Sequence, residues 1–491
     1  MFLLSFSVHI AGPWHLPAVG HLPFMRASRH LYKDFIALSK KYGDVFSVKL
    51  GLNSYVILNS ADAIKEMFNM GAFCERPRTL LASLVANAGR PTLYFGSGCK
   101  AKFSQTVLID VLKRYHDLET KMINNRLGAA LRWFHAQIAA ESNSSIEAKV
   151  FIDQSYTAVA ASRCYGCSAD PSSEFVRLLT EMYSEFNSLS AATQCLDYMP
   201  FLEPMYRDNV VKLQDLIAKI SSEVDKVVGG ETKSTEKSIY NVLAEKANEL
   251  EQKRIEATDE IKAPLTAEQI KMLSIDVFES GLVDMTINIE WMLLILALHP
   301  KVQKKIRQEI RTVIKSDSID VNKFQQMVYS KAVVHECLRT ASSSALGMYH
   351  TCRRDTQFRE WTIRKGTIII PILWTVNHNP KIFNNPDEFK PERFISDTGS
   401  FDSQHASQIA TFSFGKRRCI GEYYAKMDMM FYMLSIVQKF LLKVDKCFAD
   451  EKAEYYEGNC FDGAVISDSI MEGTAPYMHG AGKHRLIFER I

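Results

Sequence analysis

The sequence predicts a mainly α-helical protein with a minor β portion, folded as a single large domain. Helical periodicity dominates residues 107–250 and 266–298, whereas the alternation typical of strands is confined to short stretches at residues 44–58 and 361–376. The chain has 491 residues, and no Gly- or Pro-rich linker divides it. Its hydrophobic fraction of 47% is sufficient for a large core.

The charge balance and the cysteines limit the class of protein. Lys and Arg total 59 against 56 Asp and Glu, and the net charge of +3 gives no case for nucleic acid as a partner. The 10 cysteines are scattered along the chain, which favours a reducing compartment. Cys164 and Cys167 form a CxxC pair without a second pair at zinc-finger spacing, so we expect buried structural thiols.

The N-terminus combines an apolar stretch with a stiff segment. Residues 1–11 are apolar but reach only about half of the ~20 residues that a membrane-spanning helix needs, so they predict a partial anchor. Residues 12–23 contain repeated Pro and Gly, which predicts a hinge that cannot be helical. This order favours a membrane-tethered protein with an incomplete anchor. The alternative is an ordinary extended arm.

The remaining elements follow from local signals. A hairpin is predicted around residues 51–53, and Ser60 can cap the helix that follows it. Thr266 and Gln269 form a capping box, after which an apolar helix continues to Leu298 over about 48 Å. Polar residues within this helix exclude a transmembrane interpretation. An amphipathic helix follows it, beginning after Pro300.

One motif near the C-terminus carries the chemistry: Phe412-Ser-Phe-Gly415-Lys-Arg417-Arg-Cys419-Ile-Gly421 precedes a long apolar helical stretch. The helix N-terminus and the flanking arginines are expected to lower the pKa of Cys419. The two glycines permit a tight turn whose amides point at the sulfur. Such a thiolate would be a good soft ligand for haem iron, and the alternative is a reactive or an inert cysteine in a helix cap.

The spacing Phe-x-x-Gly-x-Arg-x-Cys-x-Gly resembles the haem-binding loop of the cytochrome P-450 superfamily. Glu336-x-x-Arg339 and the Pro-Glu-Arg-Phe stretch containing Arg393 resemble two further motifs of that family, in the same order. The nearest resemblance is to the animal microsomal group that includes steroid 17-hydroxylases and drug-metabolising enzymes. It implies one large cytochrome P-450 fold around a buried haem b (iron protoporphyrin IX), with residues 24–491 as the catalytic domain and Cys419 as the axial ligand of the iron.

The resemblance also implies roles for other residues. Glu336, Arg339 and Arg393 would form a structural carboxylate–guanidinium cluster beneath the haem. Arg417 matches a residue that binds a haem propionate, and Phe412, Gly415 and Gly421 belong to the cofactor loop. His350 resembles a second propionate ligand, although a structural histidine is an equal alternative. These assignments follow from the family pattern, with the donor chemistry in agreement.

Two departures from the family pattern concern the haem site. A propionate-binding Trp-x-x-x-Arg is replaced by Cys99-Lys-Ala-Lys-Phe103, where Lys100 and Lys102 are either substitutes or solvated lysines. On the long helix, Gly281-Leu-Val-Asp284-Met285-Thr286 has leucine and methionine in place of a glycine and a threonine.

Helical geometry places Gly281, Asp284, Met285 and Asn288 on one stripe, which should face the haem. Asp284, Thr286 and Asn288 are the candidate catalytic residues, and Asn288 is aligned better with Asp284 than Thr286 is. Because buried polar groups need a partner or water, a functional role is favoured over a structural polar pair.

The predicted function is insertion of one oxygen atom from O₂ into a small lipophilic substrate. Electrons would come from NADPH through NADPH-cytochrome reductase, with the protein at the cytosolic face of the endoplasmic reticulum membrane. Substrate-facing segments are expected near residues 82–94, 279–286 and 342–348. Two alternatives remain: a haem-thiolate isomerase or dehydratase that acts on peroxides, and a haem-binding protein without catalysis.

Overall fold

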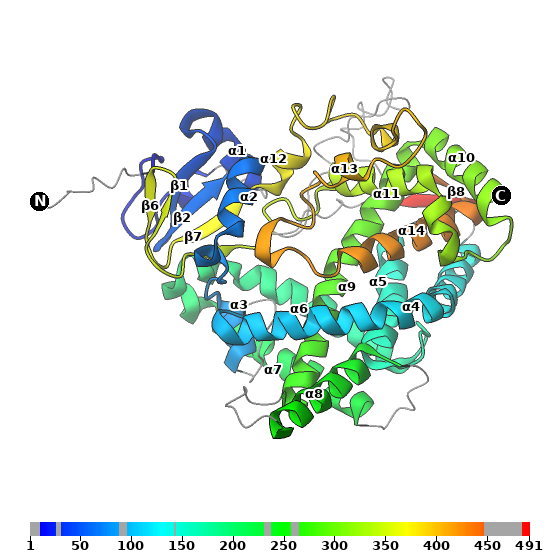
Figure 1. Ribbon diagram of the computed structural model, residues 1–491, viewed down its shortest axis with the longest axis horizontal. Helices are drawn as coiled ribbons and strands as arrows, with labels where there is room; N and C mark the ends of the chain where they lie inside the picture. Colours follow the sequence, from blue (N-terminus) through cyan, green and yellow to red (C-terminus); the bar gives the residue numbers. More distant parts are fainter. Residues whose placement is uncertain are drawn as a thin grey trace, which may run out of the picture.

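The computed structural model describes residues 10–25, 31–87, 96–141, 144–229, 237–256, 265–445 and 484–491. Helices dominate these residues, and the strands form three small sheets, which confirms the predicted fold class. The largest sheet lies at the same end of the molecule as the N-terminus, while helices make up the body (Figure 1). The predicted partial anchor falls almost entirely outside the described residues.

The largest sheet is built on the predicted hairpin. Strands β1 (Val45–Leu50) and β2 (Asn53–Leu58) pair antiparallel, and β7 (Ile368–Pro371) pairs parallel with β2, with Tyr55 opposite Ile368. Strand β4 (His350–Thr351) completes the order β1-β2-β7-β4. Segments more than 300 residues apart in the chain therefore share one sheet.

The two smaller sheets are formed by β3 (Ser145–Ile146), β9 (Leu486–Arg490) and β8 (Phe440–Val444), and by the hairpin of β5 (Thr356–Phe358) and β6 (Trp361–Ile363). The prediction of strand structure to residue 376 is wrong beyond Pro371. There the chain turns into helix α12 (Leu373–Asn377), which buries Leu373 and Val376 against the core beside α2. A short buried apolar run does not by itself distinguish these two states.

The helical body contains most of the remaining elements. Its helices and 3₁₀ or π turns are, in chain order, η1 (Leu22–Phe24), α1 (Leu31–Tyr42), α2 (Ala61–Asn69), η2 (Gly71–Phe73), α3 (Leu80–Asn87), α4 (Gly98–Ala140), α5 (Ala148–Tyr165), α6 (Glu174–Thr193), η3 (Gln194–Asp197), η4 (Pro200–Leu202), α7 (Glu203–Val228), α8 (Ile239–Glu256), α9 (Ala267–Leu298), α10 (Pro300–Glu309), η5 (Ile310–Ile314), η6 (Val321–Gln326), α11 (Val328–Ala341), η7 (Pro391–Phe394), α13 (Ser403–Ala406), η8 (Gly415–Arg417) and α14 (Glu422–Lys439).

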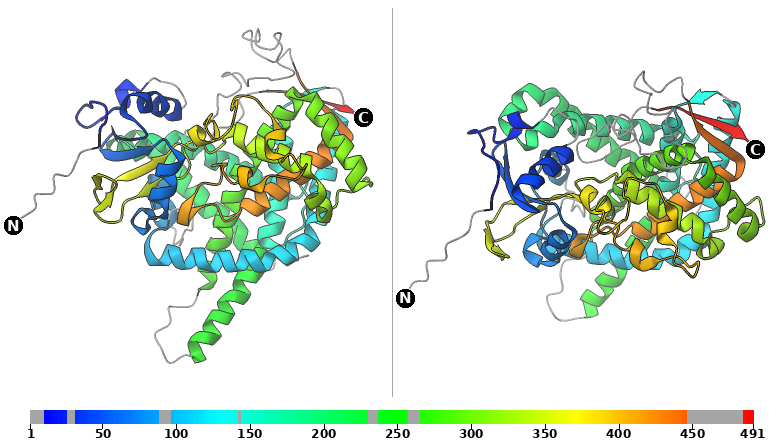
Figure 2. Two further views of the ribbon diagram at one scale, coloured as in Figure 1. Left: turned by 45° about the horizontal axis from the view of Figure 1, so that its top comes forward. Right: turned by 90° about the horizontal axis from the view of Figure 1, so that it is seen from above.

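Helix α9 runs through the middle of this body (Figures 1 and 2). Its predicted capping box is confirmed: Thr266 Oγ1 accepts from the backbone N–H of Gln269 at 3.2 Å, and Gln269 Oε1 accepts from the N–H of Thr266 at 3.0 Å. The helix is long and apolar enough to cross a membrane, but 78% of its most apolar window is buried inside the protein. It is therefore a core helix, as its polar residues predicted.

A buried ionic network fixes α14 against its neighbours. Arg163 on α5 donates to Asp428 on α14 and to Glu119 on α4, each at 2.8 Å. Arg126 also pairs with Glu119, at 2.5 Å, and Tyr156 donates to Asp428 at 2.8 Å. All four charged side chains are almost fully buried. Three helices are thereby held together by paired charges, which buried ions require.

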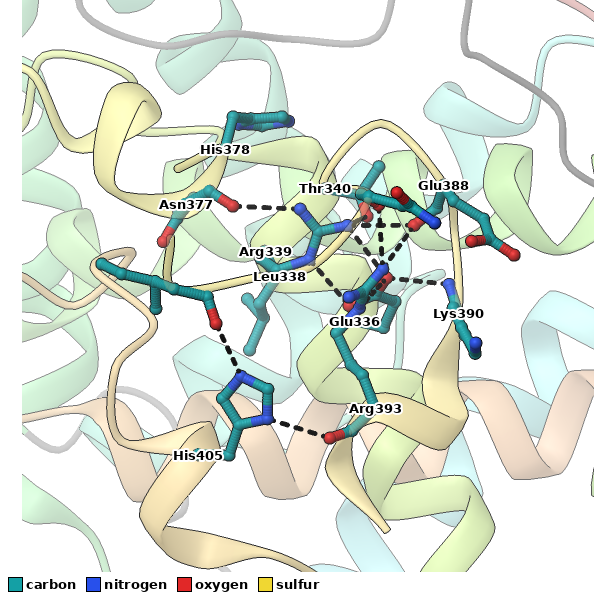
Figure 3. A network of polar contacts seen from close by, with 12 residues as sticks. Glu336, Leu338, Arg339, Thr340, Asn377, His378, Glu388, Lys390, Arg393 and His405 are labelled. Atoms are coloured by element: carbon teal, nitrogen blue, oxygen red, sulfur yellow. Dashed lines mark hydrogen bonds and ion pairs between the residues drawn. The ribbon is translucent and has the colours of Figure 1, made fainter. Parts of the chain in front are cut away.

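Glu336, Arg339 and Arg393 form a second buried cluster (Figure 3). Arg339 donates twice to the Glu336 carboxylate, at 2.8 and 2.9 Å, and Arg393 Nε donates to Glu336 Oε1 at 2.9 Å. The backbone N–H of Lys390 donates to the same oxygen at 2.8 Å. Arg339 also donates to the carbonyl of Asn377 at 3.0 Å, so the cluster ties α11 to two later segments, at residue 377 and at residues 390–393.

Substitution Arg339→Ala should destabilise the fold by on the order of 3–5 kcal/mol, because it leaves Glu336 as an incompletely paired buried charge. Lys305→Ala is the matched control, since Lys305 pairs with Glu392 at 2.6 Å while both side chains are exposed. It should cost about 1 kcal/mol or less. Urea unfolding of both variants measures the difference. Equal costs would show that the buried cluster does not stabilise the fold.

Candidate active site

The loop that carries Cys419 is closed by a backbone hydrogen bond of 3.0 Å from the N–H of Cys419 to the carbonyl of Phe412. Gly415 has φ +77, and a Cβ there would collide with the carbonyl of Phe68, so the turn requires glycine. Gly421 is the N-cap of α14, and a Cβ on it would lie 3.8 Å from the Cys419 sulfur. The loop thus presents the sulfur just before the first turn of α14.

The prediction that the protein lowers the pKa of Cys419 is wrong. Burial among protein atoms raises the pKa of this thiol to about 11, although the backbone N–H of Gly421 and the charge of Arg418 lower it. The carboxylates of Asp284 and Glu422 raise it further. The side chain is nevertheless accessible, so the thiol faces a space that the protein largely surrounds.

Both flanking arginines also have partners other than the sulfur. Arg418 is ion-paired with Glu422, one helical turn onward, which offsets its effect on the sulfur. Arg417 donates to the backbone carbonyls of Cys74 and Gly96, at 2.9 and 3.3 Å. The donor set still fits haem iron, because a bound metal cation deprotonates a coordinating thiol outright. A backbone N–H at the sulfur is the hydrogen bond that tunes such a ligand.

Helix α9 forms the opposite side of the site. Asp284 lies near enough to Cys419 for its charge to act on the thiol, and burial raises the pKa of Asp284 to about 6. A Cβ added to Gly281, one turn earlier, would meet open space. Met285, which was predicted to share this stripe, is only 4% exposed and packs in the hydrophobic core. Fewer residues of this stripe are therefore accessible than the spacing predicted, because Met285 is not one of them.

Thr286 and Asn288 already have partners. Thr286 Oγ1 donates to the carbonyl of Val283 at 3.2 Å, and its hydroxyl also interacts with the partly buried carboxyl of Asp153 on α5. Asn288 donates to the backbone carbonyl of Asp284 at 2.6 Å and accepts from Ser343 at 3.0 Å. Asn288 thus ties α9 to the segment after α11. Of the three candidate catalytic residues, Asp284 alone acts on the sulfur.

A cationic corner lies beside the thiolate loop. Arg76, which follows η2, is buried and donates to the carbonyl of Tyr349 at 2.9 Å. The positive charges of Arg76 and Arg417 both act on the buried His350 ring, which places the three side chains together. Two guanidinium groups beside an apolar core suit the two carboxylates of haem b. Sequence reasoning missed Arg76, because a single arginine in a loop carries no periodic or motif signal.

His350 has the contacts of a structural histidine. Its Nδ1 lies 2.6 Å from the carbonyl of Phe73, and its ring stacks on Phe68 with centroids 3.7 Å apart. Burial and the neighbouring arginines lower its pKa well below the ordinary value, so the ring is neutral and its one N–H is used by Phe73. The side chain of Lys100 lies outside the described residues, and Lys102 is exposed.

Comparison with known proteins agrees with this site. Residues 10–454 match the sequence profile described as Cytochrome P450. The chain is 24% identical to Cytochrome P450 1A1 of Rattus norvegicus over 445 residues, covering 87% of this chain and 83% of the relative. The corresponding proteins of Homo sapiens and Canis lupus familiaris are 24% and 26% identical, with 87% of this chain and 85% and 83% of the relatives covered. The chain belongs to the cytochrome P450 family and is a haem monooxygenase of that family.

Proposed function

We propose that this monooxygenase inserts one oxygen atom from O₂ into a small lipophilic substrate, with electrons from NADPH. The observation that supports this most is the placement of one partly buried carboxyl group, that of Asp284, on the central helix near the Cys419 sulfur. Its pKa of about 6 lies near neutral pH, so it can both release and regain a proton. The cofactor carries the oxidation, and the protein supplies positions and protons.

The residues around the site divide this work. Cys419 would bind the iron of haem b, while Arg76 and Arg417 would pair with the haem carboxylates. Haem bound in this way supplies the activation of O₂ and the oxidation of the substrate. Asp284 would deliver protons to the oxygen side of the site. Asn288 would hold the Ser343 segment in position beside α9, through its 3.0 Å hydrogen bond.

Apolar residues beside Asp284 support a lipophilic substrate. Val277, Val283 and Ile287 on α9 are only partly buried, in a helix whose other apolar residues are mostly buried, and Val277 and Ile287 also pack against the core. Residues 82–87, 279–286 and 342–348 remain the proposed substrate-facing segments. Part of the first predicted segment, residues 88–94, lies outside the described residues. Partly exposed apolar side chains beside one polar group are typical of ligand pockets.

Electron supply and membrane attachment belong to the same proposal. Lys416 and Arg418 are exposed beside the thiolate loop and would face an acidic reductase domain. At the sheet end, Trp14 is 71% exposed and Phe24 is 49% exposed, which suits contact with the endoplasmic reticulum membrane from the cytosolic face. A protein held at this end would present the rest of its surface to the cytosol.

A second candidate function is a haem-thiolate isomerase or dehydratase that acts on peroxides. The observation that favours it is the position of the hydroxyl of Thr286, which interacts with α5, while Met285 is buried. Within residues 281–288, the accessible side of the helix therefore has no hydroxyl group beside Asp284 that could relay protons.

Replacement of the proposed ligand tests the haem site. Reduced protein with CO should show the red-shifted Soret band of thiolate ligation, and Cys419→Ala should abolish that band. Cys74→Ala is the control, because Cys74 is a partly exposed thiol in the segment that contacts the same loop. It should keep the band. The same band in Cys419→Ala would show that another group binds the iron.

The cationic corner predicts how firmly haem is held. Arg76→Ala should speed transfer of haem to apomyoglobin by about tenfold or more, because a charge-assisted hydrogen bond contributes roughly 1.5–3 kcal/mol. Lys102→Ala should leave the rate unchanged, since Lys102 is exposed. If Lys102→Ala speeds haem transfer more than Arg76→Ala does, the propionate contact is made by the α4 lysines instead.

The pKa of Asp284 predicts a pH dependence of coupling. Burial raises this pKa to about 6, so the protonated donor is abundant below pH 6 and is lost as the pH rises above it. The ratio of product to NADPH consumed should therefore fall from pH 5.5 to pH 7.5 and be low and flat in Asp284→Asn. Glu268→Gln, in the exposed first turn of the same helix, should retain the wild-type profile. An unchanged profile in Asp284→Asn would assign the proton to another group.

A further inference from the structure

We propose that a hollow at the end of α10 binds a phosphate group of a small soluble ligand. Arg307, Arg311 and Lys315 line this hollow together with Ile310, Ser316, Asp317 and Gln438, and its volume is about 350 Å³. It lies beyond the C-terminal end of α10, against the last turn of α14. Cys419 precedes the other end of α14, which is 18 residues and therefore about 27 Å long. The hollow is thus separate from the active site.

Local backbone structure brings the three cations to one place. They are spaced by four residues, which puts them on the same side of a helix. The α-helix changes at Ile310 into the π turn η5, where the N–H of Lys315 donates to the carbonyl of Ile310 at 3.3 Å. Lys315 then adopts a left-handed conformation, φ 57, which ends the turn. Single π turns are uncommon and frequently occur at functional sites.

The charges in the hollow are poorly neutralised. Within the part of the chain that the structure describes, Arg307, Arg311 and Lys315 form no ion pair within 4.0 Å, and Asp317 is the one acid in the lining. Burial and the positive charge of Arg311 lower the pKa of Arg307. The two guanidinium groups, one helical turn apart, therefore repel each other beside the hollow. An anion between them would relieve that repulsion.

Hydrogen bonds to backbone carbonyls hold two side chains of the hollow, Arg307 and Gln438, in place. Arg307 Nη1 lies 3.4 Å from the carbonyls of Val437 and Phe440, at the end of α14. Gln438 Nε2 donates to the carbonyl of Ser316 at 2.9 Å, which joins α14 to the segment after the π turn. Arg311 is exposed and free to turn toward a ligand. Guanidinium forks match phosphate oxygens in pairs, which favours phosphate over a single carboxylate.

The place of the hollow favours a soluble ligand over a lipid headgroup. Helix α10 lies at the opposite end of the molecule from the sheet and the N-terminus in all three views (Figures 1 and 2). Trp14 and Phe24, which are exposed and apolar, belong to the sheet end. A membrane that contacts that end is therefore distant from the hollow. The volume of about 350 Å³ suits a small molecule.

Binding of pyrophosphate to the haem-loaded full chain tests this proposal without any turnover. Calorimetric titration at constant ionic strength should give one saturable site, and the melting temperature should rise with pyrophosphate as binding to the folded state requires. Arg311→Ala should weaken binding about tenfold or more, since one charge-assisted contact is lost. Lys304→Ala is the control, because Lys304 is exposed on α10 and does not line the hollow.

Arg311→Gln repeats the test with a polar side chain if Arg311→Ala folds poorly. Equal affinity of wild type and Arg311→Gln, or no binding of pyrophosphate at millimolar concentration, overturns the proposal. Binding to vesicles that contain phosphatidate without binding of pyrophosphate would assign the hollow to a lipid and would also overturn it. Because none of these measurements involves oxidation of a substrate, failure of the proposed monooxygenase reaction would leave their outcome unchanged.

Discussion

The position of one sulfur atom is the constraint on which the rest of the structure depends. To bind the haem iron as proposed, Cys419 would have to face α9 across the space for the haem, so the loop before it and the helix after it would both have to be rigid. The ion network of Arg163 and Asp428 fixes α14, and the buried cluster around Glu336 fixes the chain that leads toward the loop. Both sets of charges lie in the interior, where breaking a pair is costly. Their positions therefore hold the sulfur in place.

The charges of the protein alone do not favour a thiolate at Cys419. Burial raises the pKa of the Cys419 thiol. Arg418, the cation nearest in sequence, forms an ion pair with Glu422. A thiolate in this place therefore depends on the positive charge of a bound iron. Deprotonation and metal binding would accompany each other, as is usual for thiolate ligands. Burial also raises the pKa of Asp284 to about 6, which suits the proton donor proposed for this site.

Sequence reasoning predicted what depends on neighbours along the chain. The hairpin of β1 and β2, the Ser60 cap and the capping box of α9 are local, and all are confirmed. It failed where side-chain contacts decide the outcome. Met285 was placed on the accessible stripe from spacing, but core packing surrounds it. Arg418 was expected to act on the Cys419 sulfur, but it pairs with Glu422, only four residues onward. Arg76 shares a corner with Arg417, which is more than 300 residues away, and no pattern within one sequence reveals such a pair.

Transfer of oxygen from O₂ to a substrate is the central claim, and isotope labelling measures it most directly. The purified protein would be supplied with NADPH, a reductase and a lipophilic compound that shifts the spin state of its ferric haem. Under ¹⁸O₂ in unlabelled water, each molecule of product should contain one ¹⁸O atom. Product without ¹⁸O under these conditions, together with rapid conversion of a hydroperoxide in the absence of NADPH, would contradict the monooxygenase reaction and favour the isomerase.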